Sequence, residues 1–126
     1  MAVEKVLQRE IVEVFYHTPE GKDKEHPALV LSTERLFEKE EGMFYAVLIS
    51  TKNHHPEYTM KIEDEWLNRP LGKESYFVTH IVTFFKPEDV IRRTNTYVKE
   101  HFFYKVLERV IESMFELQVA IDDDDE

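Results

Sequence analysis

The chain has 126 residues, of which 42% are hydrophobic and 13% aromatic, and this composition supports one folded domain with its own core. Because the chain contains no cysteine, disulfide bonds and thiolate metal sites are excluded. The net charge of −10 excludes a general attraction to nucleic acid, so any site for a polyanion must be local.

We expect neither a membrane span nor a secretory signal in this sequence. No stretch approaches the roughly 18 apolar residues that a membrane span requires, and the N-terminal segment MAVEKVLQRE carries charges where a secretory signal needs an apolar run. We therefore expect a cytoplasmic protein without membrane contact. We also expect a single domain over residues 1–121, followed by a disordered acidic tail over residues 122–126, without which the net charge is still −5.

Strand patterns dominate the first half of the chain. Ile11–Tyr16 is rich in β-branched and aromatic residues and predicts a strand, which a polar loop over His17–His26 follows. Ala28–Leu31 is a short apolar run and predicts a second strand. After a variable loop, the longer apolar run Met43–Ile49 is typical of a strand that is covered on both faces.

The strand signal continues beyond the middle of the chain. Apolar and polar residues alternate over Tyr58–Ile62, which indicates a strand with one solvent-facing side. Tyr76–Phe85 is again β-rich and long enough to bend partway along. Lys86–Asp89, with a proline at its second position, predicts a turn or a single helical turn, and Ile91–Val98 predicts a last strand.

The last part of the chain changes to a helical period. Apolar residues recur every four positions in two rows, with charged residues on the opposite side, and the rows are Phe102, Val106, Val110 and Met114, and Phe103, Leu107, Ile111 and Phe115. This pattern predicts an amphipathic helix whose apolar stripe closes the core or also forms a dimer seam. Five or six short strands closed by one helix indicate a small barrel or a strongly curled sheet.

Metal and phosphate motifs are missing as well. The pair His54-His55 is conspicuous, but adjacent residues on a strand point to opposite faces, so the two rings do not readily bind one ion. No HExxH helix accompanies them. Glycine-rich phosphate loops and the Gly-x-Ser-x-Gly pattern of acyl-transfer enzymes are also missing. We expect neither a metal nor a cofactor.

Four short motifs follow one another in a fixed order: Ile11-Val12, Pro27–Ser32 with the letters PALVLS, Ile49-Ser50 and Ser75-Tyr76. In this order, and over about Arg9–Phe115, the chain resembles the MazF/PemK-type toxins of bacterial toxin–antitoxin systems. The pattern of that family reads G-D-I-V-x-V, R-P-A-L-V-L-S, I-T-x-Q and S-x-V. The order and spacing of the motifs, together with the closing helix, carry the resemblance.

The resemblance implies an α+β fold, namely a small SH3-like barrel of the CcdB/MazF type with five to seven short strands and a C-terminal amphipathic helix. It also implies a homodimer, a small antitoxin protein as partner, and metal-independent cleavage of single-stranded RNA. In the family, the substrate's own 2′-hydroxyl attacks the scissile phosphate. An arginine before the P-A-L-V-L-S proline supports this reaction, together with a threonine or serine at the end of the third strand.

The chain departs from the family pattern at the arginine. His26 stands at that position, and Ser50, followed by Thr51, stands where the family has threonine. A guanidinium stays charged and grips two phosphate oxygens, whereas an imidazole is mostly neutral at pH 7 and offers one donor at a time. Two interpretations remain open. Either His26 acts as a general acid or base, or catalysis is lost and the fold serves as a protein-binding module, as in the CcdB-like toxins.

We assign the catalytic role to His26, Ser50 and Thr51. Substrate binding is expected from basic residues and histidines elsewhere in the chain: Lys24, Lys52, His54, Arg69 and His80. Structural roles remain as alternatives, since the hydroxyl residues can simply end a strand, His80 can form part of a barrel wall, and Lys24 has acidic neighbours. A third function is a small-molecule or acidic-peptide site among aromatic residues that otherwise form core: Tyr16, Phe44, Tyr45, Tyr76 and Phe77.

Overall fold

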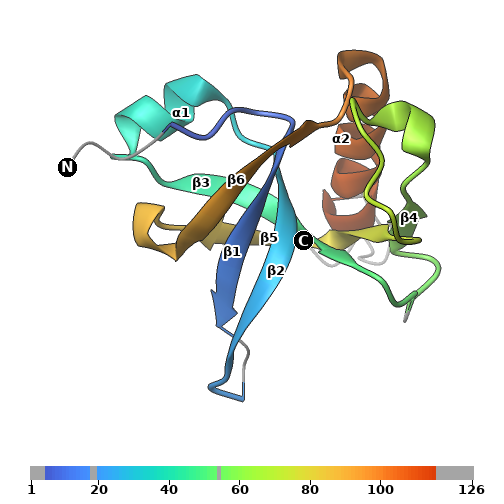
Figure 1. The fold of residues 1–126 in the computed structure, drawn as a ribbon, viewed down its shortest axis with the longest axis horizontal. Coiled ribbons are helices and arrows are strands. Elements are labelled where there is room, and N and C mark those ends of the chain that lie inside the picture. Colours follow the sequence, from blue (N-terminus) through green and yellow to red (C-terminus); the bar gives the residue numbers. More distant parts are fainter. Residues whose placement is uncertain (1–4, 18–19, 54, 116–126) are drawn as a thin grey trace, which may run out of the picture.

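The computed structural model describes residues 5–17, 20–53 and 55–115. The predicted acidic tail, residues 122–126, lies outside the described residues. The described chain forms one six-stranded antiparallel sheet with two α-helices and two short 3-10 helices (Figure 1). Within this described part, no helix is long and apolar enough to cross a membrane.

The strands follow the order β4-β5-β3-β2-β1-β6 across the sheet. Their bounds are β1 Glu10–His17, β2 Asp23–Val30, β3 Phe44–Ser50, β4 Thr59–Lys61, β5 Tyr76–Phe85 and β6 Val90–Tyr97. The α-helices are α1 Glu34–Lys39 and α2 Glu100–Phe115, and the 3-10 helices are η1 Asp64–Trp66 and η2 Pro87–Asp89. Helices α1 and α2 lie at opposite ends of the sheet, and the β1–β2 hairpin projects away from both (Figure 1).

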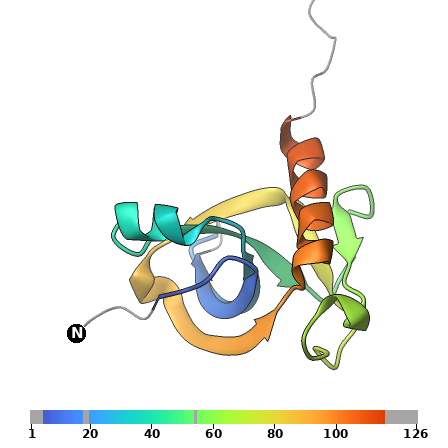
Figure 2. The same ribbon diagram turned by 90° about the horizontal axis from the view of Figure 1, so that it is seen from above.

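The sheet curls until its two edges approach each other (Figure 2). Leu67, which follows η1, forms an isolated antiparallel bridge with Val98, which follows β6. Beside it, the amide of Lys99 donates to the carbonyl of Trp66 at 2.8 Å. These contacts join the two ends of the sheet without a continuous ladder, so the predicted α+β, barrel-like fold with a C-terminal helix is confirmed.

Both faces of the curled sheet are buried. One face packs against α2 in a cluster that includes Val47, Ile49, Phe77, Val98, Phe103, Val106 and Val110. The other face packs against α1 in a cluster that includes Val12, Val14, Ala28, Phe37, Phe44, Ala46 and Leu48. Alternate residues of β3 thus enter different clusters, which explains why its sequence is a continuous apolar run.

The predicted helix is confirmed, but its apolar stripe is only partly buried. Phe103, Val106 and Val110 are in the core, whereas Ile111 and Phe115 are 57% and 69% exposed. The helix therefore closes the core with residues from both rows and leaves other apolar side chains exposed on its outer side.

Two predictions for the first half of the chain were wrong. The loop predicted over His17–His26 is too long, because His17 and Asp23–His26 belong to β1 and β2, which continue as a two-stranded ribbon up to the pair His17–Asp23. Cross-strand pairs hold such a ribbon even where its residues are polar. The segment predicted as a variable loop contains α1, whose N-cap Thr33 accepts a hydrogen bond from the amide of Leu36 at 3.2 Å. Only Phe37 of this short helix is buried, so it leaves no apolar period in the sequence.

Candidate active site between β2 and β3

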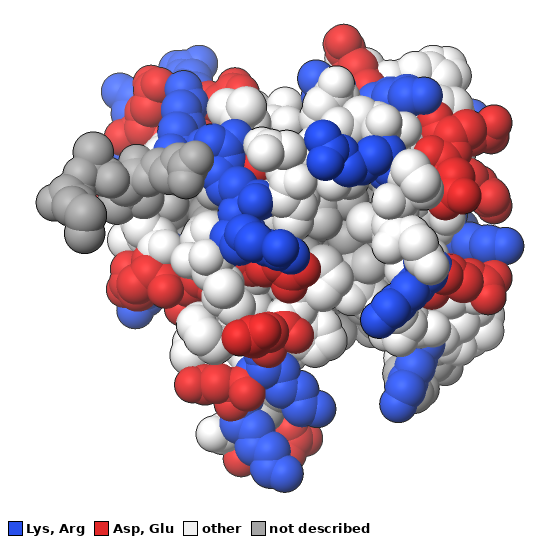
Figure 3. All heavy atoms as spheres, in the orientation of Figure 1, with Lys and Arg blue, Asp and Glu red and all other residues white. Residues whose placement is uncertain are grey.

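A hollow opens where β2 and β3 separate. The two strands pair only from Ala28–Leu48 to Val30–Ala46. Beyond this point β2 stays paired with β1, while the end of β3 is held by β5 through the pair Ser50–Tyr76. The diverging strands enclose a hollow of about 710 Å³. Figure 3 shows a recess between the hairpin and the opposite part of the molecule, with blue basic atoms on both sides.

His26 and Ser50 line this hollow from opposite strands. If the ladder that ends at Ala28–Leu48 continued for two more residues, His26 would face Ser50. The divergence of the strands replaces that pair with open space. Lys24, Thr51 and Lys52 also line the hollow, so five of the eight residues predicted from the sequence come together here.

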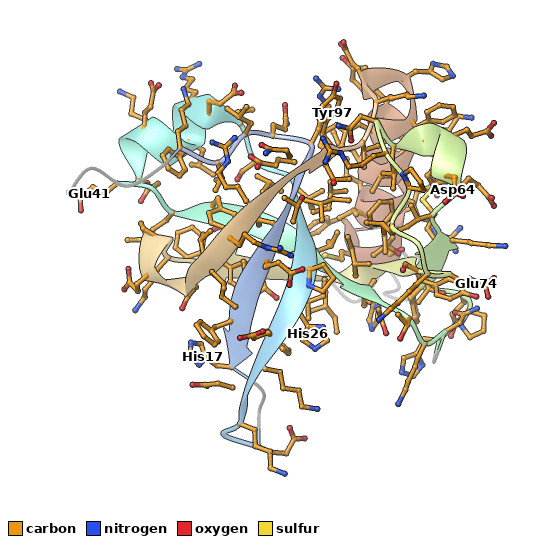
Figure 4. All side chains as sticks on the ribbon, in the orientation of Figure 1. His17, His26, Glu41, Asp64, Glu74 and Tyr97 are labelled. Atoms are coloured by element: carbon orange, nitrogen blue, oxygen red, sulfur yellow. The ribbon has the colours of Figure 1, made fainter. Side chains whose placement is uncertain are left out.

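His26 lies inside β2, paired with Val14, and not at the entrance of a strand as the sequence suggested. Its side chain is half-buried and packs edge-to-face against Tyr16, with ring centroids 6.1 Å apart. In Figure 4 it lies on the side of the hairpin that faces the recess, whereas His17 lies on the other side. The ring is thus supported by an aromatic neighbour and open to a ligand in the hollow.

Ser50 occupies the end of β3. Its hydroxyl oxygen accepts a hydrogen bond from the backbone amide of Lys52 at 3.0 Å. A hydroxyl that accepts one hydrogen bond still has its own hydrogen to donate. Because the Lys52 amide fixes the oxygen near the turn, the O–H group of Ser50 can point toward an anion in the hollow.

The hollow is basic although the protein is acidic. Three lysines line it, namely Lys24, Lys52 and Lys73, and none of their ammonium groups has an ion-pair partner within the described residues. The carboxylate that lines the same hollow belongs to Glu13, and it lies 3.4 Å from a guanidinium nitrogen of Arg92. Among the described residues that line the hollow, cations without an ion pair therefore outnumber anions without one, as a phosphate site requires.

Sequence reasoning missed Lys73 and Glu13. Lys73 follows Gly72 in the loop before β5, two residues upstream of the Ser75-Tyr76 motif, and this closeness was the available signal. Glu13 follows Ile11-Val12 and occupies the variable position x of the family pattern G-D-I-V-x-V. A carboxylate at this position of a β-rich run indicates a side chain that faces solvent or a ligand.

The other predicted binding residues lie elsewhere or cannot be placed. His54 lies outside the described residues, and Arg69 is an exposed residue after η1 that does not line the hollow. His80 is on β5 and packs against Tyr58 and His55, with ring centroids 4.8 and 5.7 Å apart. Burial lowers the pKa of His80, and the charge of His55 lowers it further, so this ring is neutral at pH 7. The structure therefore places neither Arg69 nor His80 where it could touch a ligand beside His26.

Solved toxin structures share this fold. MazF from Deinococcus radiodurans matches with a TM-score of 0.68 at 10% identity, over 86% of this chain and 96% of that one. The Mycobacterium tuberculosis toxin MazF-mt6 matches with a TM-score of 0.65 at 17% identity, over 87% and 99%. An endoribonuclease in complex with its cognate antitoxin, from a mycobacterial species, matches with a TM-score of 0.66 at 11% identity, over 86% and 93%.

No curated protein matches the chain. At such low identities the solved structures establish the fold, while the family rests on the sequence itself. The family model described as "PemK-like, MazF-like toxin of type II toxin-antitoxin system" matches residues 7–114. This range contains both strands that enclose the hollow, the loop that carries Lys73 and nearly all of α2. The chain belongs to the PemK-like, MazF-like toxin family of type II toxin–antitoxin systems.

Proposed function

We propose that the protein is an endoribonuclease that cuts single-stranded RNA in the hollow between β2 and β3. The observation that carries the proposal is the meeting of an imidazole, a hydroxyl and unpaired ammonium groups in one recess of an otherwise acidic molecule. In a protein with net charge −10, three neighbouring lysines without ion pairs to described residues create a local positive potential, and this potential favours binding of an anion. One solved structure of similar fold is itself described as an endoribonuclease.

In this mechanism His26 is the general base. Its neutral ring accepts the proton of the 2′-hydroxyl while the 2′-oxygen forms a bond to phosphorus. The bond from phosphorus to the 5′-oxygen then breaks, and that oxygen takes a proton from water or from a neighbouring ammonium. The products are a 2′,3′-cyclic phosphate and a 5′-hydroxyl. The edge-to-face contact with Tyr16 keeps the base in one orientation.

Ser50 and the lysines stabilise the additional negative charge on the phosphate. The O–H group of Ser50 donates to a phosphate oxygen, and Thr51 at the rim supplies a second hydroxyl. Lys24 and Lys52 attract the phosphates on either side, since a lysine keeps its charge at neutral pH whereas an imidazole does not. In the family pattern, one arginine both binds the phosphate and stabilises its charge. In this chain the lysines bind the phosphates, and the hydroxyl groups of Ser50 and Thr51 help to stabilise the added charge.

The test is an incubation of the purified protein with mixed-sequence RNA in EDTA, followed by analysis of the 3′ ends. We expect 2′,3′-cyclic phosphate ends, and no cleavage of an oligonucleotide in which every 2′-hydroxyl is replaced by hydrogen. Cleavage of the 2′-deoxy oligonucleotide, or products with 3′-hydroxyl ends, would show that another reaction takes place.

A second candidate function is binding of a protein without catalysis. The outer side of α2 favours it, because Tyr104, Ile111 and Phe115 are 64%, 57% and 69% exposed and lie seven and four residues apart on one helix. MazE-MazF complexes from Deinococcus radiodurans have a similar fold at 13% identity. With either function, we propose that this chain likewise binds a small antitoxin protein, forms a homodimer and acts in the cytoplasm.

A further inference from the structure

We propose that Lys73 is a phosphate-contacting residue of the hollow and supplies the permanent positive charge that His26 lacks. This inference rests on the proposed function and names a residue for it. An ammonium remains protonated at neutral pH and can hold a phosphate whether His26 is neutral or charged. Lys73 comes from the loop between η1 and β5, opposite the hairpin that carries Lys24 and His26.

The backbone around Lys73 is fixed. Gly72 has a φ of +82°, a conformation that glycine adopts without strain, and this turn directs the chain to Lys73. Two residues later, the buried hydroxyl of Ser75 donates to the carbonyl of Lys73 at 3.1 Å. The carbonyl of Ser75 in turn accepts the amide of Ile62 at 2.9 Å. These two hydrogen bonds tie the backbone of Lys73 to the start of β5 and to Ile62.

Lys73 stands on the border between two recesses of opposite charge. Lys73 also lines a second hollow, of about 660 Å³, together with Lys61 and four acidic residues, Glu63, Asp64, Glu65 and Glu74. Figure 3 shows red acidic atoms gathered on that side of the molecule, where Figure 4 labels Asp64 and Glu74. Such a wall of carboxylates repels a phosphate chain.

The carboxylates of the second hollow form no ion pair with Lys73. Its sequence neighbour Glu74 pairs with Lys61 at 3.1 Å, and the described residues offer the ammonium of Lys73 no ion pair within 4 Å. The charge of Lys73 thus remains available to the basic hollow. An RNA strand is expected to pass from Lys24 along His26 and Ser50 to Lys73 and then to turn away from the acidic recess.

The experiment measures binding of a fluorescent 2′-deoxy single-stranded oligonucleotide, which cannot be cleaved, over a series of salt concentrations. For single strands, each phosphate contact contributes about 0.7 to the slope of log K against log salt. In Lys73→Gln we expect the slope to fall by about 0.7 and the affinity at about 0.1 M salt to fall several-fold. Lys73→Arg should keep both the slope and the affinity, because it keeps the charge.

Lys99→Gln is the matched control, since Lys99 is an exposed lysine immediately before α2 that does not line the hollow. It should leave slope and affinity unchanged. If Lys73→Gln keeps the wild-type slope while Lys24→Gln and Lys52→Gln lower it, the role of Lys73 is refuted and the proposed function stands. If the unaltered protein shows no salt-dependent binding, the proposed function itself fails. Thermal unfolding of each variant reveals any loss caused by misfolding.

Discussion

The side chain of Glu10 is 5% exposed, and its two carboxylate oxygens share the N–H of Arg93 Nε, at 2.8 and 3.1 Å. The same carboxylate accepts the backbone amide of Leu7 at 3.1 Å. Glu10 starts β1 and Arg93 lies on the neighbouring strand β6 at the edge of the sheet. The pair therefore attaches the edge strand β6 to β1.

Arg93→Gln is expected to destabilise the protein by about 3 kcal/mol, because it leaves a buried carboxylate without its cation. The neighbouring pair offers a matched comparison. Arg92 is exposed and lies 3.4 Å from Glu13, so Arg92→Gln should cost less than about 1 kcal/mol. Urea unfolding of both variants measures the difference, and equal losses would show that burial of the Glu10 pair is unimportant.

His17 makes part of the stability dependent on pH. Hydrogen bonds to Asp23 at 2.5 Å and to Asp89 at 3.4 Å raise the pKa of this exposed histidine. A raised pKa in the folded state means that the stabilisation is complete below about pH 6.5 and is lost as the pH rises through the folded value. We expect NMR titration to give His17 a pKa above that of a free histidine, and Asp23→Asn to lower it. A His17 pKa that is the same in both proteins would contradict the contact.

Gly42 is expected to be intolerant of a side chain. Its φ is +91°, and an added Cβ would lie 2.8 Å from Cγ of Pro87, whose ring cannot rotate away. Gly42→Ala should therefore cost about 3 kcal/mol from backbone strain and overpacking. At Gly72 the φ of +82° is similar but nothing lies within 4 Å, so Gly72→Ala should cost about 1 kcal/mol. Thermal unfolding of the two variants distinguishes contact from strain.

The outer side of α2 is expected to bind a second copy or another protein. Ile111 is 57% exposed and Phe103, on the inner side, is 3% exposed. Ile111→Glu should therefore leave the free energy of unfolding of the monomer almost unchanged but lower the apparent mass in light scattering. Phe103→Ala should cost about 3–5 kcal/mol, because it leaves a cavity in the core. An Ile111→Glu protein with the mass of the unaltered protein would exclude this face as the dimer contact.

Much of the fold could be predicted because burial leaves a period in the sequence. Tyr76–Phe85 was predicted with the bounds of β5, and the four-residue period located α2. The ribbon that contains His17 and Asp23 could not be found in this way, because its stability comes from cross-strand pairs and not from an apolar face. Helix α1 could not be predicted from an apolar period either, because Phe37 is its only buried residue in the described chain.

The candidate site could be predicted where it follows strand ends. His26 and Ser50 were found because both flank apolar strands in a known order of motifs, and the structure places them on one hollow. For Lys73 the sequence offered only its closeness to the Ser75-Tyr76 motif, since its approach to the hollow depends on how the loop after η1 folds back onto β5. Arg69 lies four residues before Lys73 in the same loop and does not line the hollow. Closeness to Lys73 in the sequence therefore does not predict which residue of this loop reaches the hollow.

The most direct test of the account is the single-turnover rate of RNA cleavage by the unaltered protein, His26→Ala and Ser50→Ala in EDTA. The account predicts a loss of about 100-fold in His26→Ala, as expected for removal of a general base, and a clear loss in Ser50→Ala. His101→Ala serves as the control, because His101 is exposed on α2 and does not line the hollow. A cleavage rate in His26→Ala equal to that of the unaltered protein would contradict the claim that an imidazole acts on the phosphodiester in the hollow between β2 and β3.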